Sequence, residues 1–156
     1  MDTICAYLKL DHQRCDDLFY RVETGVAQRN WEEAMRHFRE YEAMMRRHIR
    51  MEENILLPAF LQTLTDSSGP ISMLRMEHVQ IQALIERMRD AIRRANPIDY
   101  VLHAETLTLL MQGHTMKEED MLYPLLDRAM GSNRSGIISA MGEYRQPEPA
   151  PRLAVG

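Results

Sequence analysis

The sequence predicts an all-α protein, an up-and-down antiparallel four-helix bundle with an internal pseudo-two-fold duplication. Three observations favour this fold. The 13 methionines against 7 glycines and 7 prolines indicate long helices with few turns. Residues that begin and end helices bound four long segments, and the second half of the chain repeats the first. At 156 residues the chain has the length of one domain that buries a core without disulfides.

The first two helices are predicted from their N-terminal caps. Thr3 can cap a helix over residues 4–27, and Asn30 can cap a second over residues 31–64, because their side-chain oxygens accept hydrogen bonds from first-turn N–H groups. Pro58 lies inside the second segment. Proline lacks an N–H and its ring clashes with the preceding turn, so we expect a kink or an end of regular helix there.

The next two helices follow the clearest loop, the Thr-Asp-Ser-Ser-Gly stretch at residues 65–69. A third helix is predicted over residues 70–95, because proline is favoured in a first turn. Asn96 followed by proline indicates a fourth, over residues 97–130, which Pro124 should also interrupt.

These helices are expected to form one domain over residues 1–144. A short extra helix over residues 132–143 is compatible with the pattern. Residues 145–156 contain three prolines and are predicted to be a disordered tail.

An internal repeat at an offset of 66 residues is the most informative feature of the chain. It relates His12 to His78, His48 to His114, Glu52 to Glu118, Pro58 to Pro124, Asn30 to Asn96, and His37 to His103. All six histidines therefore fall into three pairs, as expected for a helical hairpin packed on its copy.

The spacing that both copies share places histidines and glutamates on apolar helix faces. The predicted inward stripes are Leu8, His12, Cys15, Phe19, Val22 and Val26; Tyr41, Met45, His48, Glu52 and Ile55; Leu74, His78, Ile81, Ile85, Met88 and Ile92; and Leu107, Met111, His114, Glu118 and Met121. In each H-x-x-x-E motif the two side chains lie one turn apart, so both can reach a common centre.

Burying a carboxylate costs several kcal/mol unless something compensates its charge, and no Lys or Arg occurs on these stripes. An isolated Glu–His pair could share a proton. For four histidines and two glutamates in two matching sets, divalent metal satisfies every group at once. The sequence thus predicts a two-metal site with six ligands: His12, His48, Glu52, His78, His114 and Glu118. The glutamates can bridge the metals, each of which takes two histidines and an oxo, hydroxo or water bridge.

Neighbouring polar residues are assigned other roles. Glu53 and Glu119 are turned by about 100° from the predicted ligands, so we expect them to support the site or face solvent. His37 and His103 lie about three turns from the predicted ligands on their helices and cannot join the same centre. Tyr41 lies on the ligand stripe nearly two turns from His48 and is expected to be a packed core residue, the alternative being a position in an access channel.

Several classes of protein are disfavoured. The positions three residues before the four predicted histidine ligands hold Lys9, Met45, Arg75 and Met111, so the Glu-x-x-His motif of ferritin-like sites is missing. The zinc-protease motif H-E-x-x-H does not occur. The net charge of −4 argues against nucleic acid as the main partner.

Membrane insertion and secretion are also disfavoured. No apolar run reaches the ~18 residues that a membrane span needs. The N-terminus has no basic segment leading into an apolar stretch, so a cytoplasmic location is expected.

Four motifs, taken in order, resemble the signatures of the hemerythrin-like family of histidine-histidine-glutamate cation-binding domains. They are Asp11-His12, His48-x-x-x-Glu52-Glu53-x-x-x-Leu57-Pro58, Glu77-His78, and His114-x-x-x-Glu118-Glu119-x-x-x-Tyr123-Pro124. The resemblance implies a non-haem di-iron centre, two oxo- or hydroxo-bridged iron ions that meet O2, NO or peroxide.

Two departures from the oxygen-carrying hemerythrins are visible. Those proteins have a further histidine one turn from the third-helix ligand, where this chain has Leu74 and Gln82. They also use H-x-x-x-x-D on the last helix. The set in this chain is more similar to bacterial di-iron proteins linked to iron-sulfur repair and nitric-oxide stress, although those carry an additional cysteine-bearing N-terminal domain.

The leading hypothesis is a di-iron protein that binds or senses O2 or NO, or takes part in iron and redox homeostasis. The alternative is an enzyme that acts on peroxide or O2, or an iron donor for cluster repair. A structural bundle with an adventitious metal is a third reading. The residues fit both a binding protein and an enzyme.

Overall fold

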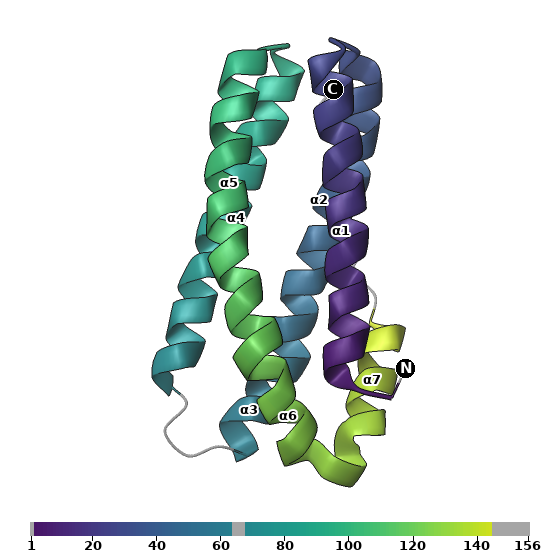
Figure 1. The fold of residues 1–156 in the computed structure, drawn as a ribbon, viewed down its shortest axis with the longest axis vertical. Coiled ribbons are helices and arrows are strands. Elements are labelled where there is room, and N and C mark those ends of the chain that lie inside the picture. Colours follow the sequence, from purple (N-terminus) through teal and green to yellow (C-terminus); the bar gives the residue numbers. More distant parts are fainter. Residues whose placement is uncertain (1, 64–67, 145–156) are drawn as a thin grey trace, which may run out of the picture.

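The computed structural model describes residues 2–63 and 68–144, which form an antiparallel four-helix bundle (Figure 1). This confirms the predicted fold class. The helices are α1 (Ile4–Ala27), α2 (Trp31–Met51), α3 (Leu57–Thr63), α4 (Ser68–Arg93), α5 (Pro97–Lys117), α6 (Tyr123–Met130) and α7 (Arg134–Glu143). Three short turns connect some of them, the π-helical η1 (Glu52–Leu56) and η2 (Glu118–Leu122) and the 3₁₀-helical η3 (Gly131–Asn133). The second bundle helix is therefore α2-η1-α3, and the fourth is α5-η2-α6.

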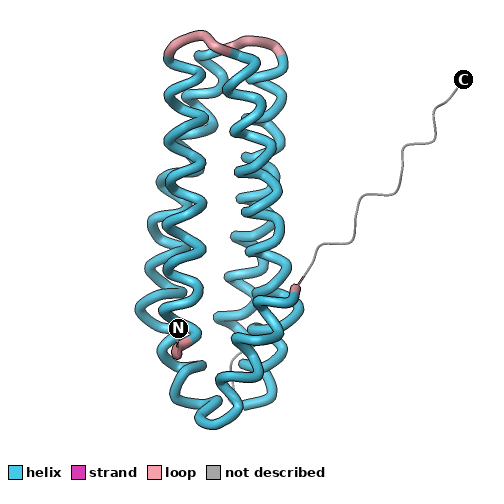
Figure 2. Tube along the Cα trace, turned by 90° about the vertical axis from the view of Figure 1, so that its right-hand side faces the viewer, coloured by secondary structure: helices cyan, strands magenta, loops and turns pink. Residues whose placement is uncertain are grey.

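The predicted caps begin three of the helices. Thr3 Oγ1 accepts from the N–H of Ala6 at 3.0 Å, and Asn30 Oδ1 accepts from the N–H of Glu33 at 3.3 Å. Asn96 Oδ1 accepts from the N–H of Asp99 at 3.1 Å. The α1–α2 turn and the α4–α5 turn lie at the same end of the bundle (Figure 2). The two helical hairpins therefore point in the same direction.

The two turns at this end share their backbone geometry. Arg29 and Ala95, 66 residues apart, both adopt the left-handed conformation, with φ of 57° and 52°. In each turn the following asparagine donates its N–H back to the helix, at 2.9 Å to Gly25 O and at 2.9 Å to Ala91 O. The duplication thus extends from the sequence to the helix ends.

A π-helical turn ends the regular α-helix just before each internal proline. In η1 the N–H of Leu57 bonds to the carbonyl of Glu52, five residues back, and in η2 Tyr123 bonds to Glu118 in the same way. Pro58 and Pro124 follow directly and cannot donate. Such turns are frequent at functional sites.

The π turns correct two predicted inward residues. Ile55 is only half-buried and Met121 is 55% exposed, whereas Leu56 and Leu122 are buried. A π turn contains one more residue than an α turn, so the inward-facing position moves from 55 to 56 and from 121 to 122.

The other predicted boundaries differ in detail. α4 begins at Ser68, two residues before the predicted start, and Pro70 falls in its first turn, where no N–H partner is needed. α6 ends at Met130, as predicted for the fourth helix. α7 lies within the range proposed for an extra helix. Leu64, residues 65–67 of the expected loop and the expected tail 145–156 lie outside the described residues.

Two apolar clusters occupy the two ends of the bundle. One surrounds Val22, Phe38 and Met88 near the α1–α2 and α4–α5 turns, and the other surrounds Leu8, Leu57 and Leu126 near α7. The buried polar residues lie between the two clusters, so apolar side chains separate them from both ends. Within the described residues, no helix is long and apolar enough to cross a membrane.

Candidate metal centre

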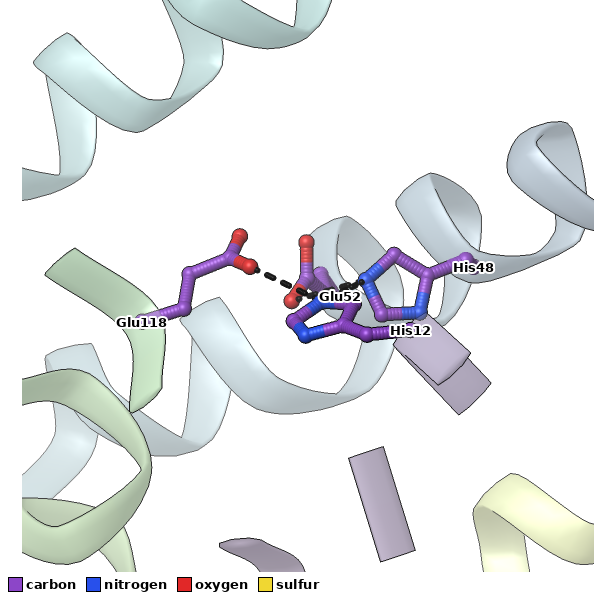
Figure 3. A group of neighbouring side chains, drawn as sticks. All are labelled: His12, His48, Glu52 and Glu118. Carbon is purple, nitrogen blue, oxygen red and sulfur yellow. Dashed lines mark hydrogen bonds and ion pairs between the residues drawn. The ribbon is translucent and has the colours of Figure 1, made fainter. Parts of the chain in front are cut away.

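The structure brings all six predicted ligands together in the middle of the bundle, and each is buried. They form two overlapping groups, each with ligand atoms within 4.8 Å of one another: His12, His48, Glu52 and Glu118, and Glu52, His78, His114 and Glu118. Figure 3 shows the first group. The structure therefore pairs His12 with His48 and His78 with His114, a choice that spacing alone leaves open.

Both glutamates are shared, and each directs its two oxygens to different halves. Glu52 Oε1 lies 3.4 Å from His48 Nε2, and its Oε2 lies 3.0 Å from His78 Nε2. Glu118 Oε2 lies 3.2 Å from His12 Nε2, and its Oε1 lies 2.7 Å from His114 Nε2. This is the arrangement expected of carboxylates that bridge two cations.

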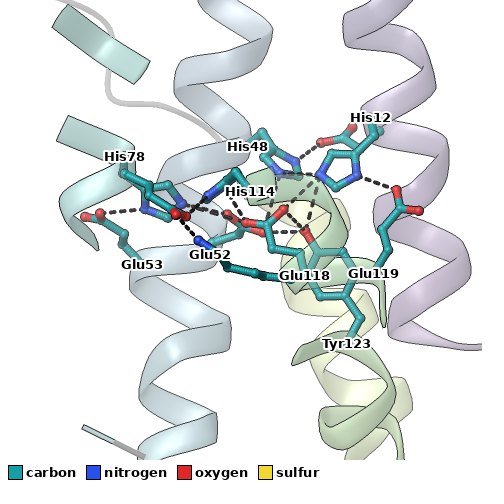
Figure 4. A network of polar contacts seen from close by, with 12 residues as sticks. His12, His48, Glu52, Glu53, His78, His114, Glu118, Glu119 and Tyr123 are labelled. Atoms are coloured by element: carbon teal, nitrogen blue, oxygen red, sulfur yellow. Dashed lines mark hydrogen bonds and ion pairs between the residues drawn. The ribbon is translucent and has the colours of Figure 1, made fainter. Parts of the chain in front are cut away.

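Each histidine is oriented by a carboxylate on its outer nitrogen, Nδ1 (Figure 4). The pairs are His12 with Glu119 at 2.7 Å, His48 with Asp11 at 2.9 Å, His78 with Glu53 at 2.9 Å, and His114 with Glu77 at 2.7 Å. An ionised carboxylate only accepts, so each Nδ1–H donates and each Nε2 directs a lone pair inward. This is the tautomer that a metal ligand needs.

Asp11 and Glu77 are functional residues to which the sequence analysis assigned no role. They directly precede His12 and His78 and lie 66 residues apart. This repeated acidic position beside each histidine was the feature of the sequence that could have indicated a role. Each orients the histidine of the neighbouring helix rather than its own neighbour in sequence. Arg47 lies 4.0 Å from Asp11, and Lys117 forms an ion pair with Glu77, so both carboxylates have a cationic partner.

The interior of the site requires a positive charge. The Nε2 atoms of His12 and His48 face each other at 3.1 Å, where two lone pairs would repel unless a proton or cation lay between them. In the described part of the chain, the buried Glu118 Oε1 also makes no hydrogen bond of suitable angle, although it lies 2.7 Å from His114 Nε2. Both features fit a metal-binding role.

The carboxylates perturb the histidine pKa values in the metal-free protein. Burial lowers the pKa of His78, but its contacts with Glu118 and Glu52 outweigh burial and raise it to about 10. The pKa values of His12, His48 and His114 are raised by the same balance. Burial acts to raise the pKa of Glu118, but the contacts with the surrounding histidines outweigh burial and hold this pKa well below its usual value. Protons therefore occupy the centre when metal does not.

Tyr123 is the third residue at the site, after Asp11 and Glu77, to which the sequence analysis assigned no role. Its buried hydroxyl donates to Glu52 Oε1 at 2.5 Å and lies 3.0 Å from Glu118 Oε2 and 3.4 Å from His12 Nε2 (Figure 4). Its counterpart in the repeat is Leu57. The hydroxyl therefore breaks the two-fold symmetry on the side of His12.

A family model for the hemerythrin HHE cation binding domain matches residues 3–126, which include all six inward residues. The chain belongs to this hemerythrin family. The family resemblance expected from the four motifs is thereby confirmed. Comparison with curated proteins and with solved structures found no match. The buried groups of this hemerythrin domain are consistent with a dinuclear metal site.

The remaining predictions concern residues around the hemerythrin centre. Glu53 and Glu119 contact histidines rather than the shared centre. His37 lies outside both groups and contacts Glu33 at 3.6 Å. Tyr41 is buried and packs against Phe19 with ring centroids 5.5 Å apart.

Proposed function

We propose that the six inward residues bind two iron ions and that the loaded protein binds or senses a small oxidant or gas, O2 or NO. The observation that carries this proposal is the division of both glutamates between the two histidine pairs. His12 and His48 would hold one ion, His78 and His114 the other, and Glu52 and Glu118 would bridge them.

The donor set favours a transition metal over calcium or magnesium. Each half offers two imidazole nitrogens with carboxylate oxygens, whereas calcium and magnesium prefer oxygen ligands alone. Membership in the hemerythrin family supports iron. Two histidines and two carboxylate oxygens give each ion four protein ligands, which leaves space for a small exogenous molecule. Bound iron would supply reversible electron transfer to such a molecule.

The protein's own contribution is to orient the ligands and exclude water. Four carboxylates fix the imidazole rings, which limits the reorganisation needed when metal binds. The apolar clusters at the two ends of the bundle limit the access of bulk water to the centre along the bundle axis. The Tyr123 hydroxyl supplies one hydrogen-bond donor beside the His12 half.

The same hydroxyl favours a second candidate function, an enzyme that acts on peroxide or O2. A buried O–H beside both carboxylates can donate a hydrogen bond or a proton to a reacting oxygen. Turnover of peroxide that disappears on Tyr123→Phe, while metal content stays unchanged, would support the enzyme over the carrier or sensor.

Metal content and the visible spectrum test the proposal. Protein purified from iron-supplemented cells should contain two iron ions per chain, with near-ultraviolet bands that shift when azide or NO is added. His48→Ala should reduce the iron content and alter the bands. His37→Ala, on the same helix but outside both groups, is the matched control and should keep both. Absence of iron, or iron that survives His48→Ala, would contradict the proposal.

A further inference from the structure

Exposed apolar side chains gather on the hairpin formed by α4 and α5, which lie side by side in Figure 1. Among the described residues, eight of the large apolar side chains that are exposed belong to these two helices, one belongs to α1 and none to α2. The eight are Met73, Met76 and Val79 on α4, and Ile98, Val101, Leu102, Leu109 and Met116 on α5. An apolar surface of this extent marks a site of interaction with another molecule.

The internal repeat indicates that this surface is not a requirement of the fold. α2 is the counterpart of α5, and six of its seven exposed residues are charged, whereas only Glu105 is charged among the ten exposed residues of α5. The repeat relates three apolar residues of α5 to charged residues of α2, namely Ile98 to Glu32, Leu102 to Arg36, and Met116 to Arg50. The same position in the bundle is thus ionic on one hairpin and apolar on the other.

The apolar residues form one continuous face. Four residues of α5 each lie two positions, about 200° around the helix, from a buried residue and therefore point away from the core: Ile98, Leu102, Leu109 and Met116. Met76 on α4 points outward for the same reason. Because the helices are antiparallel, and Met76 and Met116 each lie 20 residues from Asn96, these two methionines are at the same level. The face, called the α4–α5 face below, therefore extends over both helices.

The shape of the α4–α5 face fits another helix. Leu102, Leu109 and Met116 recur every seven residues, the spacing by which two helices pack along their length. Between Leu109 and Met116 lies Gly113, where a Cβ atom would meet nothing within 4 Å. Glycine destabilises a helix interior, and packing within the described residues does not require it here. Residues 109, 112, 113 and 116 bound a hole of the kind that receives a side chain from a facing helix.

A second copy of the chain supplies the matching side chains. When two α5 helices pair antiparallel about a two-fold axis, Leu102 of one copy meets the hole beside Gly113 of the other. In the same register, Leu109 of each copy meets the hole between Leu102 and Leu109 of the other. The pairing also brings the exposed Asp120 of each copy toward the basic end of the other, at Arg94. A single register thus accommodates the leucines, the glycine and the charges.

The area of the α4–α5 face is that of a stable dimer interface. Complete burial of one aliphatic side chain removes on the order of 100 Å² of apolar surface from water. The eight side chains are between 47% and 79% exposed, so each copy offers roughly 500 Å². Since about 60% of an interface is apolar, this corresponds to roughly 800 Å² from each copy, the size of a standard specific interface.

We propose that the chain forms a homodimer through the α4–α5 face, with the two α5 helices antiparallel and Leu102 of each copy packed beside Gly113 of the other. The inference goes beyond the proposed function and does not depend on it, because the face contains none of the six inward residues. Loss of iron binding would leave the dimer intact, so the two proposals fail separately.

Sedimentation velocity of the full chain tests the association. We expect the wild type to be a dimer at micromolar concentrations. Leu102→Arg with Met116→Arg introduces the residues that the repeat places on α2, and the dissociation constant of the dimer should rise about tenfold or more. Tyr20→Arg is the matched control, since it replaces a 70% exposed apolar residue on the other hairpin and should leave the dimer unchanged.

Three results of this experiment would overturn the proposal. They are a monomeric wild type, a dimer that persists in the double arginine variant, and a dimer that is lost in Tyr20→Arg. A monomer that instead binds phospholipid vesicles would assign the α4–α5 face to a lipid surface, which also contradicts pairing between copies.

Gly113→Leu separates specific pairing from general apolar adhesion. The change enlarges the apolar surface and favours the helix, so adhesion without a register would become stronger. In the proposed register the new side chain occupies the hole that Leu102 of the other copy needs, and the dissociation constant should rise about tenfold or more. Association as tight as in the wild type, or tighter, would show that the hole is not used.

A pair of cysteines tests the register directly. Leu102→Cys with Gly113→Cys places two thiols roughly 16 Å apart on one helix, too far to bridge within a chain, but close together between two copies. Mild oxidation should therefore give covalent dimers in the double variant and not in either single variant, with Cys5 and Cys15 present in all three. Equal yields of covalent dimer in the single and double variants would overturn the antiparallel register.

Discussion

The two halves of the duplicated bundle contain the same set of predicted ligands but differ in their surroundings. The His12–His48 half lies beside the Tyr123 hydroxyl, and His12 lines a cavity of about 880 Å³. The His78–His114 half has Leu57 at the position of Tyr123, and neither of its histidines lines that cavity. The shared features are those that metal binding needs. The differences concern access and hydrogen bonding, the features that would select what the metal meets.

Removing a shared glutamate should have the largest effect, because it breaks both halves at once. Glu52→Ala removes one oxygen from each group and one of the two proposed bridges. We expect the iron content to fall to about half of the wild-type value or less, measured by elemental analysis. Glu32→Ala, an exposed site on the same helix, is the control. Two iron ions retained in Glu52→Ala would show that the glutamate is not a bridge.

Neutralising an orienting carboxylate should have an intermediate effect on one half only. Asp11→Asn weakens the support of His48, and Glu77→Gln weakens that of His114. Each should reduce the affinity for one of the two ions roughly 10- to 100-fold, measured by titration against a chelator. The exposed Asp17→Asn on α1 should leave both affinities unchanged. Equal losses at both ions would mean that the halves act as one unit.

Removing the Tyr123 hydroxyl should have a smaller effect and should sharpen the contrast between the halves. Tyr123→Phe keeps the buried ring but removes the donor to Glu52. Loss of one buried hydrogen bond corresponds to a change of about tenfold in the affinity for azide or NO. Metal content should be unchanged. An unaltered affinity for both ligands would leave the hydroxyl with a structural role only.

The predictable and unpredictable parts of this centre have different physical origins. The inward positions of His12, His48, His78 and His114 follow from helical periodicity, which the sequence displays directly. The contact between Asp11 and His48 depends on how α1 and α2 are rotated toward each other, which periodicity does not specify. Sequence spacing therefore indicates the helix face on which a residue lies, but not the residue on another helix that it contacts.

The π turns explain the other differences. The prolines at 58 and 124 predicted an interruption, but the extra residue in each turn appears only in the backbone hydrogen bonds. That residue moves Leu122 inward in place of Met121. Tyr123 follows directly on this turn and lies with its hydroxyl at the centre. Its role was hidden because a regular helix was assumed there.

Acidity should distinguish the metal-free protein from the loaded one. The pKa of His78 rises from 6.5 in the unfolded chain to about 10 in the folded one, because its contacts with Glu118 and Glu52 outweigh burial. A raised pKa stabilises the fold fully below about 6.5, and this stabilisation is lost as pH increases toward about 10.

The melting temperature of the metal-free protein should therefore decrease over this range. In the loaded protein the metal replaces the proton on Nε2, so the stabilisation by metal should grow as pH increases. Calorimetry of both forms at several pH values measures the difference. A metal-free protein whose melting temperature increased between these values would show that His78 is held neutral, and that metal binding at this half displaces no proton.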